Sequence, residues 1–328
     1  MNDILMMRRA LQLAKCGEGR VSPNPMVGAV ITAREGIIGE GYHRHWGGPH
    51  AEVNAVNSVS EHDRYLLREA TMYVTLEPCS HYGKTPPCSE LIIRMGIPRV
   101  VVATLDPFEK VSGRGVAMLR EAGIDVSTGL LGEESRALNR RFITAHTLKR
   151  PYITLKWAQT ADGYTAGTPG GGRLIISNHL STVWMHAERS RNDAIFVGTT
   201  TVATDNPRLD CRRAPGRLPV AASFASAIRY EKAHIMDGRR VVLREKDEPL
   251  PDFLHRLYDI EGITSIMVEG GARTLQEYIN LDLYDEVRIE TADFKTGKGI
   301  ASPDIDLARL NEISNFDCNG NKIRIYQQ

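Results

Sequence analysis

Apolar positions in the first half of the chain recur with two spacings, one typical of helices and one typical of short strands. Helical spacing predicts helices over residues 3–15, 50–59, 88–95 and 115–122. Short apolar runs predict strands over residues 28–31, 36–41, 70–76, 99–104 and 124–128. Helices that alternate with apolar strands are typical of a layered α/β domain, so we expect that fold for this half.

A second α/β pattern follows a break at Lys149-Arg150-Pro151. Residues 133–148 keep an approximate helical period and predict a connecting helix, which a proline cannot continue. Beyond the break, we expect strands over residues 152–158, 194–197, 240–243, 265–268, 286–290 and 322–326, and helices over 180–190 and 275–279. A chain of 328 residues suits two domains, and the break predicts domains of residues 1–148 and 149–328.

The charge balance of the chain is nearly neutral, with 41 Lys and Arg against 40 Asp and Glu. A nucleic-acid-binding protein is expected to carry a basic face, and these totals indicate none. No apolar run approaches the ~20 residues that cross a bilayer. Near the N-terminus the arginines follow the apolar residues, the reverse of the order in a secretory signal. We therefore expect a cytoplasmic protein with neither nucleic acid nor a membrane as partner.

One histidine and two cysteines stand in the order of a zinc site. His50, Glu52, Cys79 and Cys88 follow the H-x-E…P-C-x-x-C signature of zinc nucleobase deaminases, except that eight residues separate the cysteines instead of two. Three protein ligands leave the fourth zinc position for water, as in catalytic sites. Glu52 follows His50 by two residues, so we expect it to take a proton from that water and to deliver protons to the ring and to the leaving ammonia.

Two other interpretations of these residues remain open. The zinc could be structural, with a fourth ligand from His81, His43 or His45. Alternatively, the cysteines could be a buried pair beside a surface histidine. The other three cysteines, Cys16, Cys211 and Cys318, are scattered and odd in number, so they do not indicate a disulfide framework.

Two segments in the second half could meet phosphate. VGTTTV at residues 197–202 and VEGGARTL at residues 268–275 each run from a strand into a glycine- or threonine-rich turn. Main-chain N–H groups and hydroxyls in such turns can hold phosphate oxygens. The pair Gly270-Gly271 taken alone more often marks an ordinary turn.

Three motifs of the first half together resemble the bifunctional deaminase/reductase family of riboflavin biosynthesis. They are SPNPMVGAV at residues 22–30, GYHRHWGGPHAE before Val53, and PCSHYGKTPPC at residues 78–88. The resemblance implies a cytidine-deaminase-like three-layer domain that binds Zn²⁺. It also implies deamination of 2,5-diamino-6-(5-phosphoribosylamino)pyrimidin-4(3H)-one to 5-amino-6-(5-phosphoribosylamino)uracil. We expect Asn24, His43 and Lys84 to contact this substrate, with Lys84 suited to its phosphate.

The second half resembles the reductase of the same family through KWAQTADGYTA from Lys156, residues 193–212, SIMVEGGARTLQEYI and DLYDEVRIE. The resemblance implies a dihydrofolate-reductase-like α/β domain that uses NADPH to reduce the ribosyl group to ribityl, in a homo-oligomer, dimer or tetramer. Residue by residue, it implies cofactor contacts at Ala158, Thr201, Asp205, Gly271, Ala272, Arg273, Thr274, Leu275 and Gln276. It implies substrate contacts at Arg189, Leu209, Arg212 and Glu269.

Two segments of this half depart from the family pattern. The chain has Leu174-Ile175-Ile176-Ser177 where the family usually has Trp-Ile-Thr-Gly/Ser. It has Pro219-Val220-Ala221-Ala222-Ser223 where the family usually has Pro-x-Arg-Val-Val-x-Asp. A deaminase with a degenerate, non-reducing second domain is therefore an alternative. Two more are a deaminase of a free base, nucleoside or RNA, and a non-enzymatic zinc module that binds a partner.

Overall fold

The computed structural model describes residues 2–34, 36–83, 86–107, 113–168, 174–229 and 233–328. Lys84, one of the expected substrate contacts, lies outside the described residues. The chain divides into two compact units, Met1–Leu148 and Lys149–Gln328. Among the described residues, no helix is long and apolar enough to span a bilayer.

Unit 1 is built on a five-stranded sheet in the order β2-β1-β3-β4-β5. β1 pairs antiparallel with β2 and β3, whereas β3, β4 and β5 run parallel. The strands are β1 (Gly28–Ala33), β2 (Gly36–Tyr42), β3 (Thr71–Val74), β4 (Arg99–Val102) and β5 (Asp125–Thr128). β1 is buried along its whole length, as a strand covered on both faces should be.

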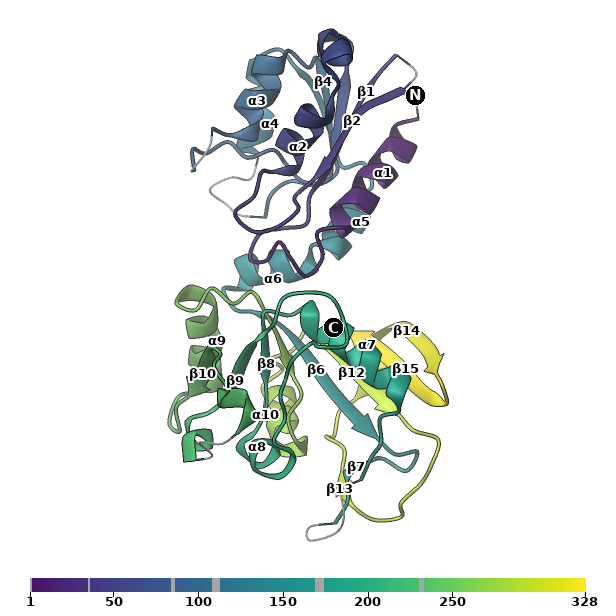
Figure 1. Cartoon of the computed structure of the whole chain (residues 1–328), viewed down its shortest axis with the longest axis vertical. Coiled ribbons are helices and arrows are strands. Elements are labelled where there is room, and N and C mark those ends of the chain that lie inside the picture. The colour runs from purple at the N-terminus through teal and green to yellow at the C-terminus, as the bar shows by residue number, and fades with distance from the viewer. Residues whose placement is uncertain (1, 35, 84–85, 108–112, 169–173, 230–232) are drawn as a thin grey trace. The chain divides into compact units, whose positions relative to one another are not determined.

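Helices cover both faces of this sheet (Figure 1). On one face α1 (Asp3–Lys15) packs Met6, Met7 and Ala10 against apolar residues of the strands. On the other face lie α2 (Ala51–Ser58), α3 (Cys88–Met95) and α4 (Arg114–Glu121). A 3₁₀ segment, η1 (Glu61–Glu69), joins α2 to β3. The unit is therefore a three-layer α/β/α domain, which confirms the expected fold class.

Gly41 lets α2 lie directly on β2. A Cβ atom at Gly41 would lie 2.3 Å from the Ala55 nitrogen and 2.5 Å from the Ala51 oxygen, both in the α2 main chain. Gly36, in the same strand, has nothing within 4 Å of such an atom. The start of α2, which holds His50 and Glu52, therefore depends on a glycine at position 41.

Gly41→Ala is expected to destabilise unit 1 by about 1–3 kcal/mol, because the added methyl group pushes α2 off the sheet. Gly36→Ala is the matched control, since it adds the same methyl group where space is open. Urea unfolding followed by circular dichroism measures both variants. Equal unfolding midpoints for the two variants would contradict the expectation.

The predicted connecting helix over residues 133–148 is wrong as a single helix. The structure has two helices, α5 (Gly132–Leu138) and α6 (Arg140–Leu148), separated at Asn139. Asn139 leaves helical geometry, with φ −102° and ψ 17°. Its side chain bonds to the main chain of Met26, and the sequence gives no signal for that distant partner.

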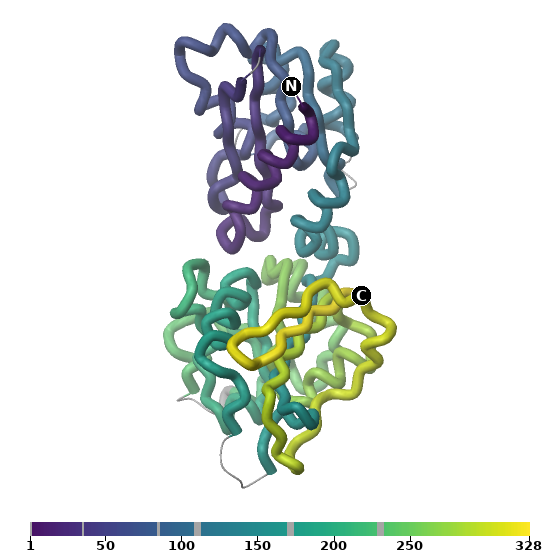
Figure 2. Tube along the Cα trace, turned by 90° about the vertical axis from the view of Figure 1, so that its right-hand side faces the viewer, coloured from purple at the N-terminus to yellow at the C-terminus, as the bar shows by residue number. Residues whose placement is uncertain are grey.

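Unit 2 holds an eight-stranded sheet in the order β10-β9-β8-β11-β6-β12-β15-β14. The strands from β10 to β12 run parallel, and β15 and β14 are antiparallel additions at one edge. The parallel strands are β6 (Tyr152–Gln159), β8 (Ala194–Phe196), β9 (Val220–Phe224), β10 (Val241–Arg244), β11 (Ser265–Val268) and β12 (Glu286–Thr291). The antiparallel pair is β14 (Asn311–Cys318) and β15 (Asn321–Gln327), drawn in yellow in Figure 2.

Helices again cover both faces of this sheet. α9 (Leu250–Asp259) and α10 (Ala272–Asn280) bury apolar residues on one face, and α7 (His179–Ser190) and α8 (Thr199–Asp205) do so on the other. Strands β7 (Tyr164–Ala166) and β13 (Ile300–Ala301) form a separate pair. The remaining short 3₁₀ segments are η2 (Ala225–Arg229), η3 (His234–Met236) and η4 (Leu307–Arg309). The pattern of apolar residues did not predict β9, α9 or β14.

Candidate metal centre and cofactor site

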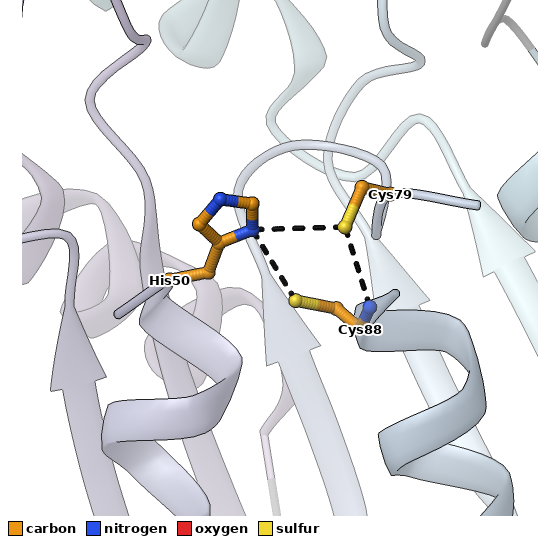
Figure 3. A group of neighbouring side chains, drawn as sticks. All are labelled: His50, Cys79 and Cys88. Atoms are coloured by element: carbon orange, nitrogen blue, oxygen red, sulfur yellow. Dashed lines mark hydrogen bonds between the residues drawn. The ribbon is translucent and has the colours of Figure 1, made fainter. Parts of the chain in front are cut away.

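Three side chains of unit 1 bring their ligand atoms to one point (Figure 3). His50 is the residue before α2, Cys88 is the first residue of α3, and Cys79 lies in the loop after β3. The Nδ1 atom of His50 lies 3.6 Å from the Cys79 sulfur and 3.4 Å from the Cys88 sulfur. The Cys88 main-chain N–H also donates to the Cys79 sulfur at 3.3 Å.

This geometry fits zinc. Zinc lies about 2.0–2.1 Å from nitrogen and about 2.3 Å from sulfur, so tetrahedral ligand atoms lie about 3.5 Å apart. The two measured N···S distances agree with that spacing. Among the described residues, no fourth His, Cys, Asp or Glu joins the group. The arrangement is therefore an open three-ligand site, the form found in catalytic zinc centres.

The pKa values of the thiols favour metal binding. Hydrogen bonds, first with Cys88 and then with His50, lower the pKa of the Cys79 thiol to about 4. The same contact with Cys79, together with burial, raises the pKa of Cys88. The pair thus holds one negative charge before a cation arrives, and a divalent cation displaces the remaining proton from such a thiol.

Glu52 lies beside these residues in the first turn of α2, with 3 % of its surface exposed. Burial, and next the negative charge on Cys79, raise the pKa of its carboxyl group to about 7. The Cys88 thiol hydrogen-bonds to the same carboxyl group. A carboxyl group with a pKa near neutrality can both accept and release a proton at working pH.

Asn24 and His43, the two expected substrate contacts within the described residues, meet each other. The Asn24 side-chain nitrogen lies 3.1 Å from His43 Nε2, and His43 Nδ1 lies 3.0 Å from the Pro49 oxygen. The rings of His43 and His50 are 5.7 Å apart, edge to face. His43 is thus fixed by neighbours on both ring nitrogens instead of serving as a fourth metal ligand.

Glu77 is a structural residue of this site that motif reading missed. Its carboxylate is buried and accepts main-chain hydrogen bonds from Asp106, Gly113 and Val116, at 3.2, 2.9 and 3.1 Å. These bonds tie the start of α4 to the segment that leads into Cys79. The sequence signal that could have identified Glu77 is its position two residues before the metal ligand Cys79.

In unit 2, the expected substrate residues gather around a buried ion pair. Arg189 donates two hydrogen bonds to Glu269, at 2.7 and 2.6 Å, and their side chains are 15 % and 10 % exposed. Arg189 also donates to the Asp210 main-chain oxygen at 3.2 Å, and the Asp210 carboxylate pairs with Arg212 at 2.5 Å. The neighbouring Leu209 is buried, with a φ of +49°.

The expected cofactor turns lie at the carboxyl ends of neighbouring strands. Gly198 precedes α8 after β8, and Gly271 precedes α10 after β11. Neither helix start has a side-chain cap, so its first N–H groups are available to a phosphate. A Cβ atom at Gly271 would lie 3.8 Å from the Thr201 hydroxyl, so the two turns lie close to each other. These features fit the pyrophosphate of a dinucleotide.

The other residues expected to contact the cofactor lie partly in the core and partly on the surface of unit 2. The Leu275 side chain belongs to the core, and Thr274 is also buried. Gln276 exchanges hydrogen bonds with the Asp304 main chain at 3.1 and 2.8 Å. Arg273 lines a surface groove along α10, and Asp205 is exposed at the end of α8. Of the two remaining residues, Ala158 lies in β6 and Ala272 begins α10.

A second polar group in unit 2 was not singled out from the sequence. Glu290 is buried and accepts hydrogen bonds from Ser177 at 2.7 Å and from Asn321 at 2.6 Å. Lys156 lies 3.7 Å from the same carboxylate. Within the segment 174–177, which departs from the family pattern, Ser177 matches the final Gly/Ser of that pattern.

Comparisons with known proteins agree with this geometry. Residues 1–104 match the family model described as cytidine and deoxycytidylate deaminase zinc-binding region, and residues 151–314 match the RibD C-terminal domain. The riboflavin biosynthesis protein RibD of Aquifex aeolicus is 40 % identical, over 93 % of this chain and 91 % of that protein.

Two solved structures are similar over almost the whole chain. A diaminohydroxyphosphoribosylaminopyrimidine deaminase/5-amino-6-(5-phosphoribosylamino)uracil reductase from Thermotoga maritima is 36 % identical, with a TM-score of 0.88, and 99 % and 98 % of the two chains covered. Acinetobacter baumannii RibD is 29 % identical, with a TM-score of 0.86 and the same coverage. This chain therefore belongs to the RibD family of riboflavin biosynthesis, whose members join a zinc-dependent deaminase and an NADPH-dependent reductase in one polypeptide.

Proposed function

We propose that residues 1–148 deaminate 2,5-diamino-6-(5-phosphoribosylamino)pyrimidin-4(3H)-one and that residues 149–328 reduce the ribosyl group of the product to ribityl. The observation that carries the first assignment is the open group of His50, Cys79 and Cys88 with Glu52 buried beside it. The substrate assignment is supported by the similarity to the Thermotoga enzyme over nearly the whole chain.

In the deaminase, His50, Cys79 and Cys88 would hold the zinc. When bound, zinc supplies a water activated for attack on the amino-bearing ring carbon near neutral pH. Glu52 takes a proton from the attacking water and returns protons to the ring and to the departing amine, which leaves as ammonia. Its raised pKa suits both directions of transfer. Asn24 and His43 orient the pyrimidine.

In the reductase, the starts of α8 and α10 would hold the pyrophosphate of the cofactor. NADPH, when bound, supplies the hydride for the C1 position of the ribosyl group. Arg212 is suited to grip the 5-phosphate of the substrate through two bonds. Arg189, whose paired donors are held by Glu269, would contribute its positive charge and its remaining N–H groups. Glu269 holds Arg189 in place. Burial raises the pKa of Glu269, but the charge and hydrogen bonds of Arg189, together with the charges of Lys156 and His186, lower that pKa overall.

The two segments that depart from the family pattern do not favour the degenerate alternative. Residues 219–223 contribute to β9, which pairs with β8 and β10 in full register although it carries Ala221 and Ala222. In the other segment, Ser177 matches the family pattern and bonds to Glu290. Assembly into a homo-oligomer remains a prediction from the family resemblance.

A coupled assay on purified, zinc-loaded protein tests both assignments. Ammonia release and NADPH oxidation are followed separately with the diaminopyrimidine phosphoribosyl substrate, and both signals are expected. Chelation of zinc should stop ammonia release but spare NADPH oxidation when the deaminated intermediate is supplied directly. Ammonia release without NADPH oxidation would show that the second domain is a degenerate reductase. The absence of both signals would refute the substrate assignment.

A further inference from the structure

A buried asparagine at the break between α5 and α6 holds the main chain of a distant loop. Asn139 is 2 % exposed. Its Oδ1 atom accepts a hydrogen bond from the Met26 N–H at 2.8 Å, and its Nδ2 atom donates to the Met26 oxygen at 2.9 Å. One side-chain amide thus pairs with both main-chain groups of Met26, as a neighbouring strand would.

The main chain of the loop that contains Met26 has few other donors, and its next residue, Val27, accepts a hydrogen bond from the His43 N–H at 2.9 Å. Pro23 and Pro25 have no N–H group, so they cannot donate a hydrogen bond. The Asn24 N–H bonds to Val21 within the same loop. The Met26 N–H therefore provides a tie to another part of the unit, and Asn139 is its partner.

The same loop reaches the proposed metal centre. Asn24, two residues before Met26, lies 3.1 Å from the Nε2 atom of His43. His43 Nδ1 in turn lies 3.0 Å from the oxygen of Pro49, the residue before the metal ligand His50. A continuous chain of contacts therefore runs from Asn139 through the loop to the site at which the pyrimidine is proposed to bind.

We propose that Asn139 is a positioning residue for deamination: it fixes the loop so that the Asn24 side chain is presented to the pyrimidine. This inference rests on the proposed deaminase function. Loss of the Met26 tie frees the loop without removing a metal ligand or the proton-transferring Glu52. Weaker substrate binding is therefore the expected effect, and loss of the metal is not.

Two substitutions of Asn139 test the expected weakening of substrate binding. N139D keeps an acceptor for the Met26 N–H but places a second oxygen against the Met26 oxygen, so one bond is replaced by repulsion, whereas N139L loses both bonds. We expect N139D to raise the KM for ammonia release by at least about tenfold, the factor that corresponds to about 1.4 kcal/mol and to one lost hydrogen bond. N139L should raise the KM as well. Zinc content, kcat for ammonia release and NADPH oxidation with the deaminated intermediate should stay near wild type.

Ser135→Ala is the matched control. Ser135 is a buried α5 residue that donates to the Thr75 oxygen at 2.6 Å, so its loss removes a comparable bond from the same helix. The Ser135 side chain does not bond to the loop that contains Met26. The KM of the Ser135→Ala variant should therefore match wild type even if the melting temperature of the variant falls.

An unchanged KM in N139D would overturn the inference, as would a fall in zinc content or kcat without a change in KM. The same holds if Ser135→Ala raises KM equally, because the effect would then be general destabilisation. A wild-type protein that releases no ammonia would instead refute the deaminase function on which the inference rests.

Discussion

Glu52→Gln is expected to lower kcat for ammonia release by about 100- to 10,000-fold, the contribution usually made by a general acid–base group. The amide has nearly the same shape as the carboxylate but cannot accept and pass on a proton. The zinc ligands are untouched, so metal content should remain at wild-type level. Stopped assays of ammonia on the zinc-loaded variant measure the effect.

The second reaction on the same chain gives an internal control. NADPH oxidation with the deaminated intermediate should be unaffected in Glu52→Gln, since the substitution lies in unit 1. Glu90→Gln is the matched variant: Glu90 follows Cys88 by two residues, as Glu52 follows His50, but it bonds to the Tyr82 hydroxyl at 2.6 Å. Full deaminase turnover in Glu52→Gln would refute the proton-transfer role.

Arg189→Met is expected to abolish most NADPH oxidation and to destabilise unit 2. Removal of one partner from a buried ion pair leaves the other charge uncompensated, at a cost of about 3–5 kcal/mol. Loss of a charge-assisted contact to the substrate phosphate should lower kcat/KM for reduction by up to about 100-fold. Ammonia release should persist. Urea unfolding and the two separate assays measure these effects.

Two further variants separate stability from substrate binding. The double variant R189M/E269L removes both charges and should regain stability, because apolar residues replace buried ion pairs at little cost. Its reductase activity should remain lost. Arg150→Met is the control: Arg150 makes an equally paired contact with Asp285, and both side chains are 15 % exposed. This pair lies just before the amino ends of β6 and β12. A double variant that reduces substrate normally would show that Arg189 has only a structural role.

The sequence predicts unit 1 well because its signals are local. Each strand is a short apolar run or a glycine-containing edge, and His50, Cys79 and Cys88 stand in the order of a zinc motif. The structure brings these three side chains together. The break at Asn139 could not be predicted, because no proline or glycine marks it and the partner of its side chain, Met26, lies far away in the sequence.

Unit 2 is harder to predict for two physical reasons. β9 contains small residues, Ala221 and Ala222, that are strand-forming only because β8 and β10 bury them on either side. β14 is mainly exposed and polar, so its pairing with β15 supports it more than its own side chains do. α9 did carry a signal, since its apolar residues recur at helical spacing after Pro249.

The buried charges of unit 2 also escape sequence reasoning. Glu188, Glu286 and Arg288 are buried in the unit, with Arg288 in contact with both glutamates. Charged residues are rarely buried without partners, so each in isolation suggests a surface position. The partners come from α7 and β12, which only the folded chain brings together.

The strand order of unit 2 has a consequence for the timing of folding during synthesis. β6 is the first strand of that unit to leave the ribosome, yet it lies between β11 and β12, with Tyr152 opposite Ser265 and Thr154 opposite Glu286. It must wait for partners from near the end of the chain. Unit 1 closes its sheet with β5 well before that point. The nascent deaminase can therefore fold while the reductase is still incomplete, as is usual for domains that emerge in sequence.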